Sequence, residues 1–253
     1  MNNIVSIAKN TFKETIRDKI LYGILSFALL FLISTTLFGS ISLGEDIKVV
    51  KDFGLAGIYI FSIIIAIFLG TSLIHKELEK RTLYVILSKP VSIAQFILGK
   101  FFGLWSSVSL NVLIMTIVYL IIVYVEGGGI DYPAFFANLL LVFELSIFVS
   151  LTVLFSTFTT PLAGTIYSVI ILYIGHSMNM MKQSVAKSGA FMKYLFDLIY
   201  YAFPNLEKFN FRNEVVHGTL PNSGQIIYPI IYSLLFSAVL LYLATVALKK
   251  QEI

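Results

Sequence analysis

The amino-acid sequence predicts an all-α membrane protein that forms one domain over residues 1–253 and crosses the membrane six times. Hydrophobic residues make up 58% of the chain and charged residues only 13%, whereas about 25% of the residues in a typical soluble domain are charged. The apolar residues gather in runs of about 20 residues, the length at which a helix crosses a bilayer. These runs cover residues 21–43, 54–74, 102–125, 134–158, 161–178 and 226–248.

Short polar segments separate neighbouring runs. Gly and acidic residues at 44–46 follow the first run, and a triple-glycine turn at 127–129 follows the third. Such residues are typical of turns rather than of spans. Only Thr159 and Thr160 separate the fourth run from the fifth. These two predicted spans must therefore form an antiparallel hairpin.

The composition also excludes several classes of protein. The chain contains no cysteine, so it has no disulfide framework and no thiolate metal site. Its net charge of +4 is too small to indicate binding to nucleic acid. The N-terminal segment is polar, and the first run is too long for the apolar region of a cleavable signal. We therefore expect an uncleaved first span.

Lysine and arginine residues near the ends of the runs predict the orientation, because cytoplasmic loops of membrane proteins carry an excess of them. The short loops on one predicted side hold only Lys48 and Lys51. We therefore expect a multi-pass protein of the cell (inner or cytoplasmic) membrane with both termini in the cytoplasm and the segment 179–225 outside. The cytoplasmic set is Lys9, Lys13, Arg17, Lys19, Lys76, Lys80, Arg81, Lys89, Lys100, Lys249 and Lys250.

Two further helices are predicted at the membrane surfaces. In residues 1–20, apolar side chains recur at helical spacing and charged side chains fill the other face. This pattern is typical of an amphipathic helix in the membrane plane, here an elbow helix that leads into the first span. Residues 191–203 are apolar but too short to cross the membrane. They are expected to form a re-entrant or interfacial helix within the external segment.

The segment 75–100 is densely charged, although the runs on both sides of it are almost uncharged. It would continue the second run as a helix and then turn at 88–90, where Pro90 suits the first turn of a new helix. Its charged residues include Glu77, Lys80 and Arg81, and Leu87 adds apolar surface. A long, amphipathic, basic segment on one side of the membrane indicates a docking surface for another protein. The alternative is an ordinary interfacial loop.

Several stretches of the chain carry a family resemblance. They are Glu77 with Thr82 five residues later, Leu87-Ser-Lys-Pro-Val-Ser92, Gly99-Lys100, Asn10-Thr-Phe-Lys-Glu-Thr-Ile-Arg-Asp-Lys-Ile-Leu-Tyr22, Phe155-Ser-Thr-Phe-Thr-Thr-Pro161 and Tyr201-Ala-Phe-Pro-Asn-Leu-Glu207. Together, and in their order along nearly the whole chain, they resemble the permeases of type-2 ATP-binding-cassette (ABC) exporters. The resemblance is strongest to the NosY-like branch, which contains the permease of nitrous-oxide-reductase maturation.

The resemblance implies a transport subunit that is driven by a separate ATPase. The segment after the second span would be the coupling helix, which packs on the ATPase subunit. Two copies of that subunit would bind ATP and Mg, and a second permease chain, most simply in a homodimer, would help to enclose the path. The sequence agrees, because it lacks a Gly-x-x-x-x-Gly-Lys-Ser/Thr phosphate loop. The implied ATPase-docking residues are Glu77, Lys80, Arg81, Thr82, Leu87 and Pro90.

Glu144 is the only acidic residue well inside a predicted span, about 15 Å from its outer end at 1.5 Å per residue. A carboxylate at the membrane centre costs about 2.5–3.5 kcal/mol, so we expect Glu144 to face the interior and to be paired or protonated. It could line the translocation path, together with Asn111, and bind substrate or protons. Alternatively, it makes a structural hydrogen bond to a polar side chain such as Asn111, Ser146 or Tyr167.

A histidine and three methionines end the fifth run. Imidazole and thioether groups suit monovalent copper. Their spacing matches no specific metal pattern, however, and the same residue types are common at the ends of spans. We therefore predict no metal site and no cofactor in this chain. The weak candidates for metal ligands are His176, Met178, Met180 and Met181.

The sequence is thus best interpreted as the six-span permease subunit of an ABC transporter, an exporter that works by alternating access, as the resemblance implies. A proton-coupled secondary carrier that uses Glu144 is the alternative from another class. Such carriers contain internal repeats, and we see none. An intramembrane hydrolase would need a His-Glu-x-x-His motif or paired intramembrane acids. Besides lipid, the external segment 179–225 could meet substrate or an extracytoplasmic protein.

Overall fold

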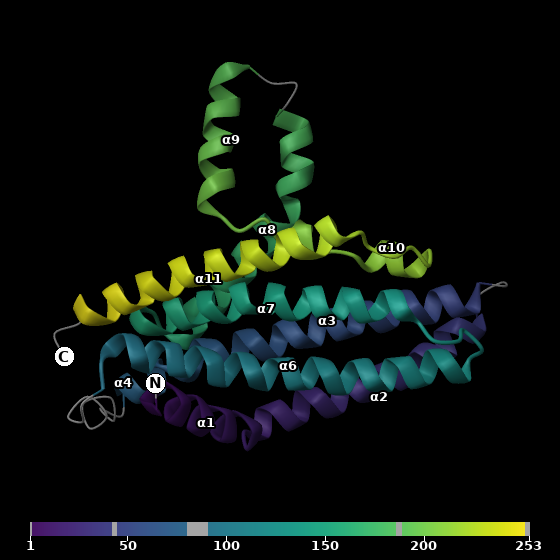
Figure 1. The fold of residues 1–253 in the computed structure, drawn as a ribbon, viewed down its shortest axis with the longest axis horizontal. Coiled ribbons are helices and arrows are strands. Elements are labelled where there is room, and N and C mark those ends of the chain that lie inside the picture. Colours follow the sequence, from purple (N-terminus) through teal and green to yellow (C-terminus); the bar gives the residue numbers. More distant parts are fainter. Residues whose placement is uncertain (1, 42–44, 80–90, 186–188, 251–253) are drawn as a thin grey trace.

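The computed structural model describes residues 2–41, 45–79, 91–185 and 189–250, and nearly all of the described chain is helical (Figure 1). Within these described ranges, six helices are long and apolar enough to cross a membrane, which confirms the predicted number. They are α2 (Lys19–Ile41), α3 (Asp46–Leu73), α6 (Ile93–Val125), α7 (Tyr132–Phe158), α8 (Pro161–Val185) and α11 (Ser223–Lys250). The shorter elements are α1 (Asn2–Ile16), α4 (His75–Glu79), α9 (Ala190–Ala202), the 3-10 helix η1 (Leu206–Phe209) and α10 (Arg212–Val216).

The long helices all extend beyond the predicted spans, and three of them do so by seven or more residues. α3 begins at Asp46 rather than at residue 54, α6 begins at Ile93 rather than at 102, and α8 continues to Val185 rather than ending at 178. Apolar runs mark only the part of a helix that suits lipid, whereas local capping decides where the helix begins. At the start of α6, the Ser92 side chain accepts a hydrogen bond from the backbone of Gln95, and the Gln95 side chain accepts one from the backbone of Ser92. This capping box satisfies amide groups of the first turn.

α7 forms the centre of the bundle. In its most apolar stretch 72% of the residues are buried, compared with 61% for α3 and only 22% for α2 and α8. Figure 1 shows α6 and α11 on either side of α7. The core is therefore built around α3 and α7, and the other long helices present one apolar face outward, as helices that contact lipid do.

Small residues let α3 approach α7 closely. A Cβ atom on Gly70 would lie 2.0 Å from the hydroxyl oxygen of Thr152, so only glycine fits there. Small residues at helix contacts are typical of membrane bundles, because van der Waals packing is a main source of helix association in lipid.

α1 lies along the first half of α6, where two glycines receive it. A Cβ atom on Gly99 would lie 2.6 Å from the Ile7 side chain, and one on Gly103 would lie 2.6 Å from the Ala8 carbonyl oxygen. α1 ends at Ile16, and the Asp18 side chain accepts a hydrogen bond from the Ile20 amide at the start of α2. Residues 2–18 therefore form one helix and a turn. Their location at the membrane surface stays a prediction.

The start of α1 and the end of α11 lie at the same end of the bundle (Figure 1); we call it the terminal end, and the opposite end the far end. At the far end, Lys51 on α3 forms an ion pair with Asp131 at 3.1 Å. The Tyr119 hydroxyl donates to the same carboxylate oxygen at 2.9 Å. These contacts join the end of α6 and the start of α7 to α3.

The segment between α8 and α11 has two parts. α8 and α9 form a hairpin, and the part of it that contains α9 and the end of α8 projects away from the bundle (Figure 1). After α9, residues 203–216 return to the bundle through η1 and α10, and we call them the return segment. Leu206 and Val215 are 0% exposed and Phe209 is 2% exposed. Although it spans nothing itself, the return segment is part of the core.

Candidate functional site

Glu144 lies in the middle of α7, where its side chain is 2% exposed. It is 12 residues from the start of the helix at Tyr132, or about 18 Å along the axis. The carboxylate points toward α3, α8 and the return segment. A buried carboxylate is stable only where neighbouring groups replace its hydration.

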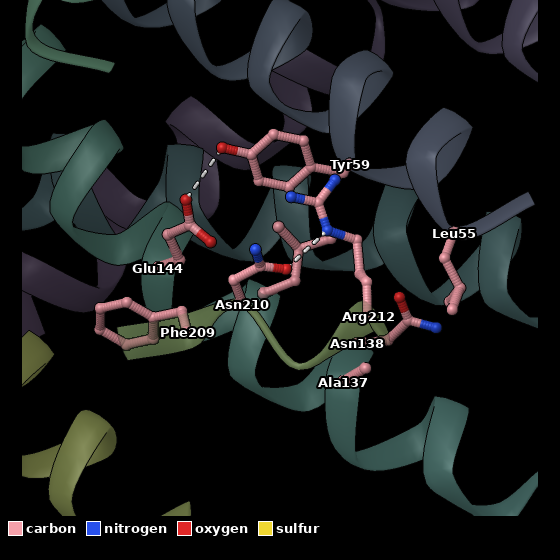
Figure 2. A pocket seen from close by; sticks show the side chains of 9 residues that line it. Leu55, Tyr59, Ala137, Asn138, Glu144, Phe209, Asn210 and Arg212 are labelled. Atoms are coloured by element: carbon pink, nitrogen blue, oxygen red, sulfur yellow. Dashed lines mark hydrogen bonds between the residues drawn. The ribbon is translucent and has the colours of Figure 1, made fainter. Parts of the chain in front are cut away.

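Two side chains from other helices bind the Glu144 carboxylate. The Tyr59 hydroxyl on α3 donates to Oε1 at 3.1 Å (Figure 2), and His176 Nε2 on α8 lies 3.1 Å from the same oxygen. Tyr59 and His176 also contact each other, with their rings at 87° and their centroids 5.5 Å apart. Three helices therefore meet at a single carboxylate oxygen.

The return segment completes this cluster. Glu207 Oε2 lies 3.1 Å from His176 Nδ1, and the Asn210 amide donates to the other oxygen of Glu207 at 3.0 Å. Arg212 Nε donates to the side-chain oxygen of Asn210 at 3.1 Å, and the Arg212 guanidinium lies 4.1 Å from the centroid of the Tyr59 ring (Figure 2). A guanidinium over an aromatic face is a favourable cation–π contact.

We call these six residues the charged cluster. Its members are Tyr59, Glu144, His176, Glu207, Asn210 and Arg212.

Apolar packing holds the return segment at this position. Leu206 fits against Gly175, one residue before His176, where an added Cβ atom would lie 2.6 Å from the leucine side chain. Pro204 precedes Asn205, whose backbone amide donates a hydrogen bond to the Tyr232 hydroxyl at 3.0 Å. The chain therefore turns at residues 204–205 and places Glu207 beside the imidazole.

The balance of charge in the cluster explains how it tolerates burial. Both ring nitrogens of His176 face carboxylate oxygens, and only the protonated imidazole donates from both nitrogens. A protonated His176 and the Arg212 guanidinium would balance the two carboxylates. Removing one member of such a buried set leaves an uncompensated charge, which typically costs about 3–5 kcal/mol.

A small cavity lies beside the cluster. Figure 2 shows its lining, which includes Asn138 on α7 and Phe209 on η1 in addition to Tyr59, Glu144 and Arg212. It has room for about one water molecule. The cluster is therefore closed in this conformation, and a larger solute enters only if the return segment moves away from α3, α7 and α8.

Glu144 does not use the partners that the sequence suggested. The Asn111 amide donates to the Ser107 carbonyl on its own helix at 2.8 Å. The Ser146 hydroxyl donates to the Phe143 carbonyl and contacts Ser237 on α11. Tyr167 packs against the Phe155 ring. None of the three suggested side chains bonds to Glu144, but the carboxylate does make interhelical hydrogen bonds, to Tyr59 and His176.

The four weak candidates for metal ligands do not gather at one point. His176 is engaged by two carboxylates, and Met178 is 0% exposed whereas Met180 is 74% exposed. In the described ranges, no group of three or more His, Cys, Asp or Glu side chains could hold a metal ion.

A second ionic contact lies at the terminal end. Lys100 on α6 is 3% exposed and forms an ion pair with Glu77 on α4; Glu14 on α1 lies 3.8 Å from its amine. This amine therefore links three helices. The side chain of Glu77 is 17% exposed, and its docking role stays a prediction. The other docking candidates, Lys80, Arg81, Thr82, Leu87 and Pro90, lie outside the described residues.

The sequence singled out Glu144 and His176 but not their relation. The two were placed in separate hypotheses, and Tyr59 and Arg212 were in none. The only signal for Glu207 was the stretch from Tyr201 to Glu207 in the family resemblance. A charged residue in a segment between spans looks like an ordinary surface residue until the fold places it beside a buried charge.

The fold and the site together define a multi-pass membrane protein with a closed, charged cluster between its helices. The family model described as "ABC-2 family transporter protein" matches residues 5–253, and the chain belongs to this family. It is therefore the membrane permease component of an ABC transporter, a transmembrane transport subunit and not the ATPase. A comparison with curated proteins finds no match.

Proposed function

We propose that this chain is the permease subunit of an ABC exporter and that the charged cluster closes the far end of its translocation path. One observation supports this proposal most: the cluster joins three helices, α3, α7 and α8, to a segment that does not span the membrane. Such a contact can separate without unfolding any long helix. Movement of the return segment would expose Glu144 and open the path, so that the closed arrangement is one of two states in alternating access.

The terminal end is assigned to the cytoplasm and the far end to the outside. Apart from Lys48 and Lys51, the basic residues near the ends of the long helices lie at the terminal end or in the external segment, and Lys51 is neutralised by Asp131. This distribution follows the tendency of cytoplasmic loops to be positive. The protein would lie in the inner or cytoplasmic membrane of the cell. In a dimer, the two copies of segment 75–100 would then face two ATPase subunits, which bind ATP and Mg in the cytoplasm.

A second permease chain is expected beside the first, in a homodimer. The hairpin of α8 and α9 stands away from the bundle, and its apolar side chains include Tyr173, Met180 and Phe191, each at least 74% exposed. A second copy would cover part of this surface. The other partner that could bind this hairpin is an extracytoplasmic protein.

The NosY-like branch of the family remains our choice, supported by the stretches named in the sequence. A proton-coupled secondary carrier is not favoured, because membership in the ABC-2 family assigns the driving force to ATP. The carrier would work without any ATPase, and the permease would not.

Locking the return segment onto α8 tests the role of the charged cluster. Asn205 on the return segment donates to the Asn179 side chain on α8 at 3.3 Å, and the chain has no native cysteine. In the variant Asn179→Cys/Asn205→Cys, a disulfide or a short thiol cross-linker should abolish coupled ATP hydrolysis by the assembled transporter, and a reductant should restore it.

A matched control places the link within the external segment. Asn222 and Gln225 bond to each other, so Asn222→Cys/Gln225→Cys can be cross-linked without joining the return segment to α8. This variant should keep coupled hydrolysis. Normal coupling in the locked Asn179/Asn205 variant would refute the proposed closure. If no protein with a phosphate-loop ATPase assembles with the chain and changes its hydrolysis rate on binding, the permease assignment itself fails.

A further inference from the structure

An apolar groove lies between α6 and α11 in the terminal half of the bundle, over one face of α7. Its open volume of about 490 Å³ lies in the range of roughly 300–1,000 Å³ that is common for ligand pockets. Phe101 and Leu241 are buried in its wall, and Phe102 and Tyr242 are exposed at its rim. Ala238 leaves the space between them open.

The polar groups that line the deep part of the groove are satisfied within the protein. The Trp105 indole donates to the Val142 carbonyl at 2.9 Å. The Ser146 hydroxyl donates to its own helix, and Ser237 contacts Ser146 at 3.2 Å. A ligand therefore gains no hydrogen bond in this part by being polar. The deep groove favours a hydrocarbon chain.

The shallow end of the groove is different, because Lys249 lies there. Lys249 is exposed in the last turn of α11, and among the described residues it forms no ion pair. Ala94, in the first turn of α6, lines the same end. The positive end of a helix dipole adds to the attraction of the amine for an anion.

The length of the groove matches one leaflet of a bilayer. Leu234 and Lys249 both line it and are 15 residues apart on α11, which is about 22 Å along the helix. One leaflet, including its headgroup region, is about 20–22 Å thick. A lipid with its phosphate at Lys249 would therefore place its acyl chain along the groove and reach Trp105.

We propose that this groove binds an anionic phospholipid of the cytoplasmic leaflet, with the acyl chain between α6 and α11 and the headgroup phosphate on Lys249. Basic residues at the cytoplasmic ends of spans attract anionic headgroups. The proposal uses the cytoplasmic assignment of the terminal end but neither the export function nor the role of the charged cluster.

The single tryptophan of the chain provides a direct measurement. The full-length protein is reconstituted into phosphatidylcholine vesicles that contain a small fraction of phosphatidylglycerol, and one of the two lipids carries bromine on its acyl chains. Bromine quenches tryptophan fluorescence on contact. We expect brominated phosphatidylglycerol to occupy the site about fivefold more strongly than brominated phosphatidylcholine at equal mole fraction, as one basic residue near the surface would give.

Two pairs of variants distinguish recognition of the lipid headgroup from binding of the acyl chain. Lys249→Gln should remove the preference for phosphatidylglycerol, whereas Lys250→Gln, at an exposed position outside the groove, should keep it. Ala238→Phe should fill the groove and remove most quenching by either lipid. Val239→Phe, which faces outward at 59% exposure, should leave quenching unchanged.

Equal quenching by both brominated lipids, or quenching that survives Ala238→Phe, would overturn the proposal. The proposal also fails if a Tyr242→Cys variant cross-links to a second copy of the chain while Trp105 stays unquenched, because the groove is then covered by protein. None of these results depends on ATP hydrolysis, so failure here is distinct from failure of the proposed transport function.

Discussion

Glu144 places a carboxylate in the middle of α7, where its neighbours have to replace the water that it loses. Tyr59 and His176 bind the same oxygen, and Glu207 holds the other side of the imidazole. These bonds connect residues 85 and 32 positions apart in the sequence. The carboxylate therefore contributes less to the stability of α7 than to the relative position of α3, α8 and the return segment.

Replacing Glu144 with glutamine tests whether its charge matters. Because the amide keeps a hydrogen bond acceptor for Tyr59, Glu144→Gln should still fold, with a loss of stability no larger than the roughly 3–5 kcal/mol typical of a buried charge that loses its partner. It removes the negative charge that faces His176, so we expect the coupling of ATP hydrolysis to fall at least tenfold in the reconstituted transporter. Thermal unfolding in detergent measures the first effect, and hydrolysis with and without the permease measures the second.

The exposed carboxylate Glu126, in the turn after α6, is the control: Glu126→Gln should change neither quantity. If Glu144→Gln couples hydrolysis at the wild-type rate between about pH 6 and 8, the range in which histidine changes its charge, then Glu144 is a packing residue.

At this scale the sequence predicted correctly that Glu144 is buried and paired. An acid inside an apolar run is costly, so Glu144 had to have partners. The identity of the partners could not be predicted, because it depends on which faces of α3 and α8 turn toward α7. Ser146 is only two positions away in the sequence, yet it bonds to the backbone of its own helix, as Asn111 does.

The helices α1 and α6 show how one element positions another. α6 has 33 residues and is about 50 Å long, well beyond the roughly 30 Å of hydrocarbon. Its first turns therefore extend past the apolar core, where α1 covers them and Lys100 can be buried by protein rather than by lipid. α1, α4 and α6 meet at this amine.

Adding one methyl group at Gly103 should displace α1. The new Cβ atom would lie 2.6 Å from the backbone oxygen of Ala8, and a backbone atom can only move together with its helix. Gly103→Ala should therefore lower stability by about 1–3 kcal/mol, as overpacking does. Limited proteolysis near residues 17–18 should also become faster.

Gly23→Ala is the matched control, because nothing lies within 4 Å of an added Cβ atom there. In a helix interior this change should stabilise the protein by about 0.5–1 kcal/mol. If the two variants unfold at the same temperature, the close contact of α1 with α6 does not hold in the membrane protein.

The ion pair of Lys100 and Glu77 should be costly to break from one side. Lys100→Met removes the Lys100 cation from the Glu77 carboxylate, whose side chain is 17% exposed, so we expect a loss of about 1–3 kcal/mol. The double variant Lys100→Met/Glu77→Gln removes both charges and should recover most of that loss. Thermal unfolding in detergent measures both variants, with Lys76→Met as the exposed control. Additive effects of the two substitutions would contradict the pairing.

The sequence predicted these elements only in part. It placed an amphipathic helix in residues 1–20 and a charged segment at 75–100, but apolar periodicity does not show that Asp18 ends one helix and begins the next. It also treated Gly99-Lys100 as a family motif. In the structure, Gly99 packs closely against α1, and Lys100 forms an ion pair with Glu77.

For the whole molecule, apolar runs were sufficient to predict six long helices, because their length and composition follow directly from the thickness of a bilayer. Their arrangement could not be predicted in the same way. It depends on single close contacts, such as Gly70 with Thr152 and Gly175 with Leu206. The closed return segment was not predicted either, since its apolar residues occur in runs too short to be recognised as core.

Cysteine labelling tests the orientation of the whole bundle. The chain has no native cysteine, so single cysteines at exposed Lys76 and Glu126 report on the two ends. Because basic residues cluster at the terminal end, an impermeant thiol reagent applied to intact cells should label Glu126→Cys and not Lys76→Cys. Both should react after the cells are opened. The opposite pattern in intact cells would invert the assignment.

The charged cluster also sets an order on biosynthesis. Glu144 and His176 enter the membrane with α7 and α8, whereas Glu207 and Arg212 leave the ribosome some thirty residues after His176. Until residues 203–216 have been translocated and have packed onto the bundle, the nascent chain carries a buried charge without its full set of partners. We expect quality-control proteases to recognise the chain in that interval. Chains that end after residue 185 should therefore be degraded faster than chains that end after residue 250, and Glu144→Gln should narrow the difference in a pulse–chase measurement.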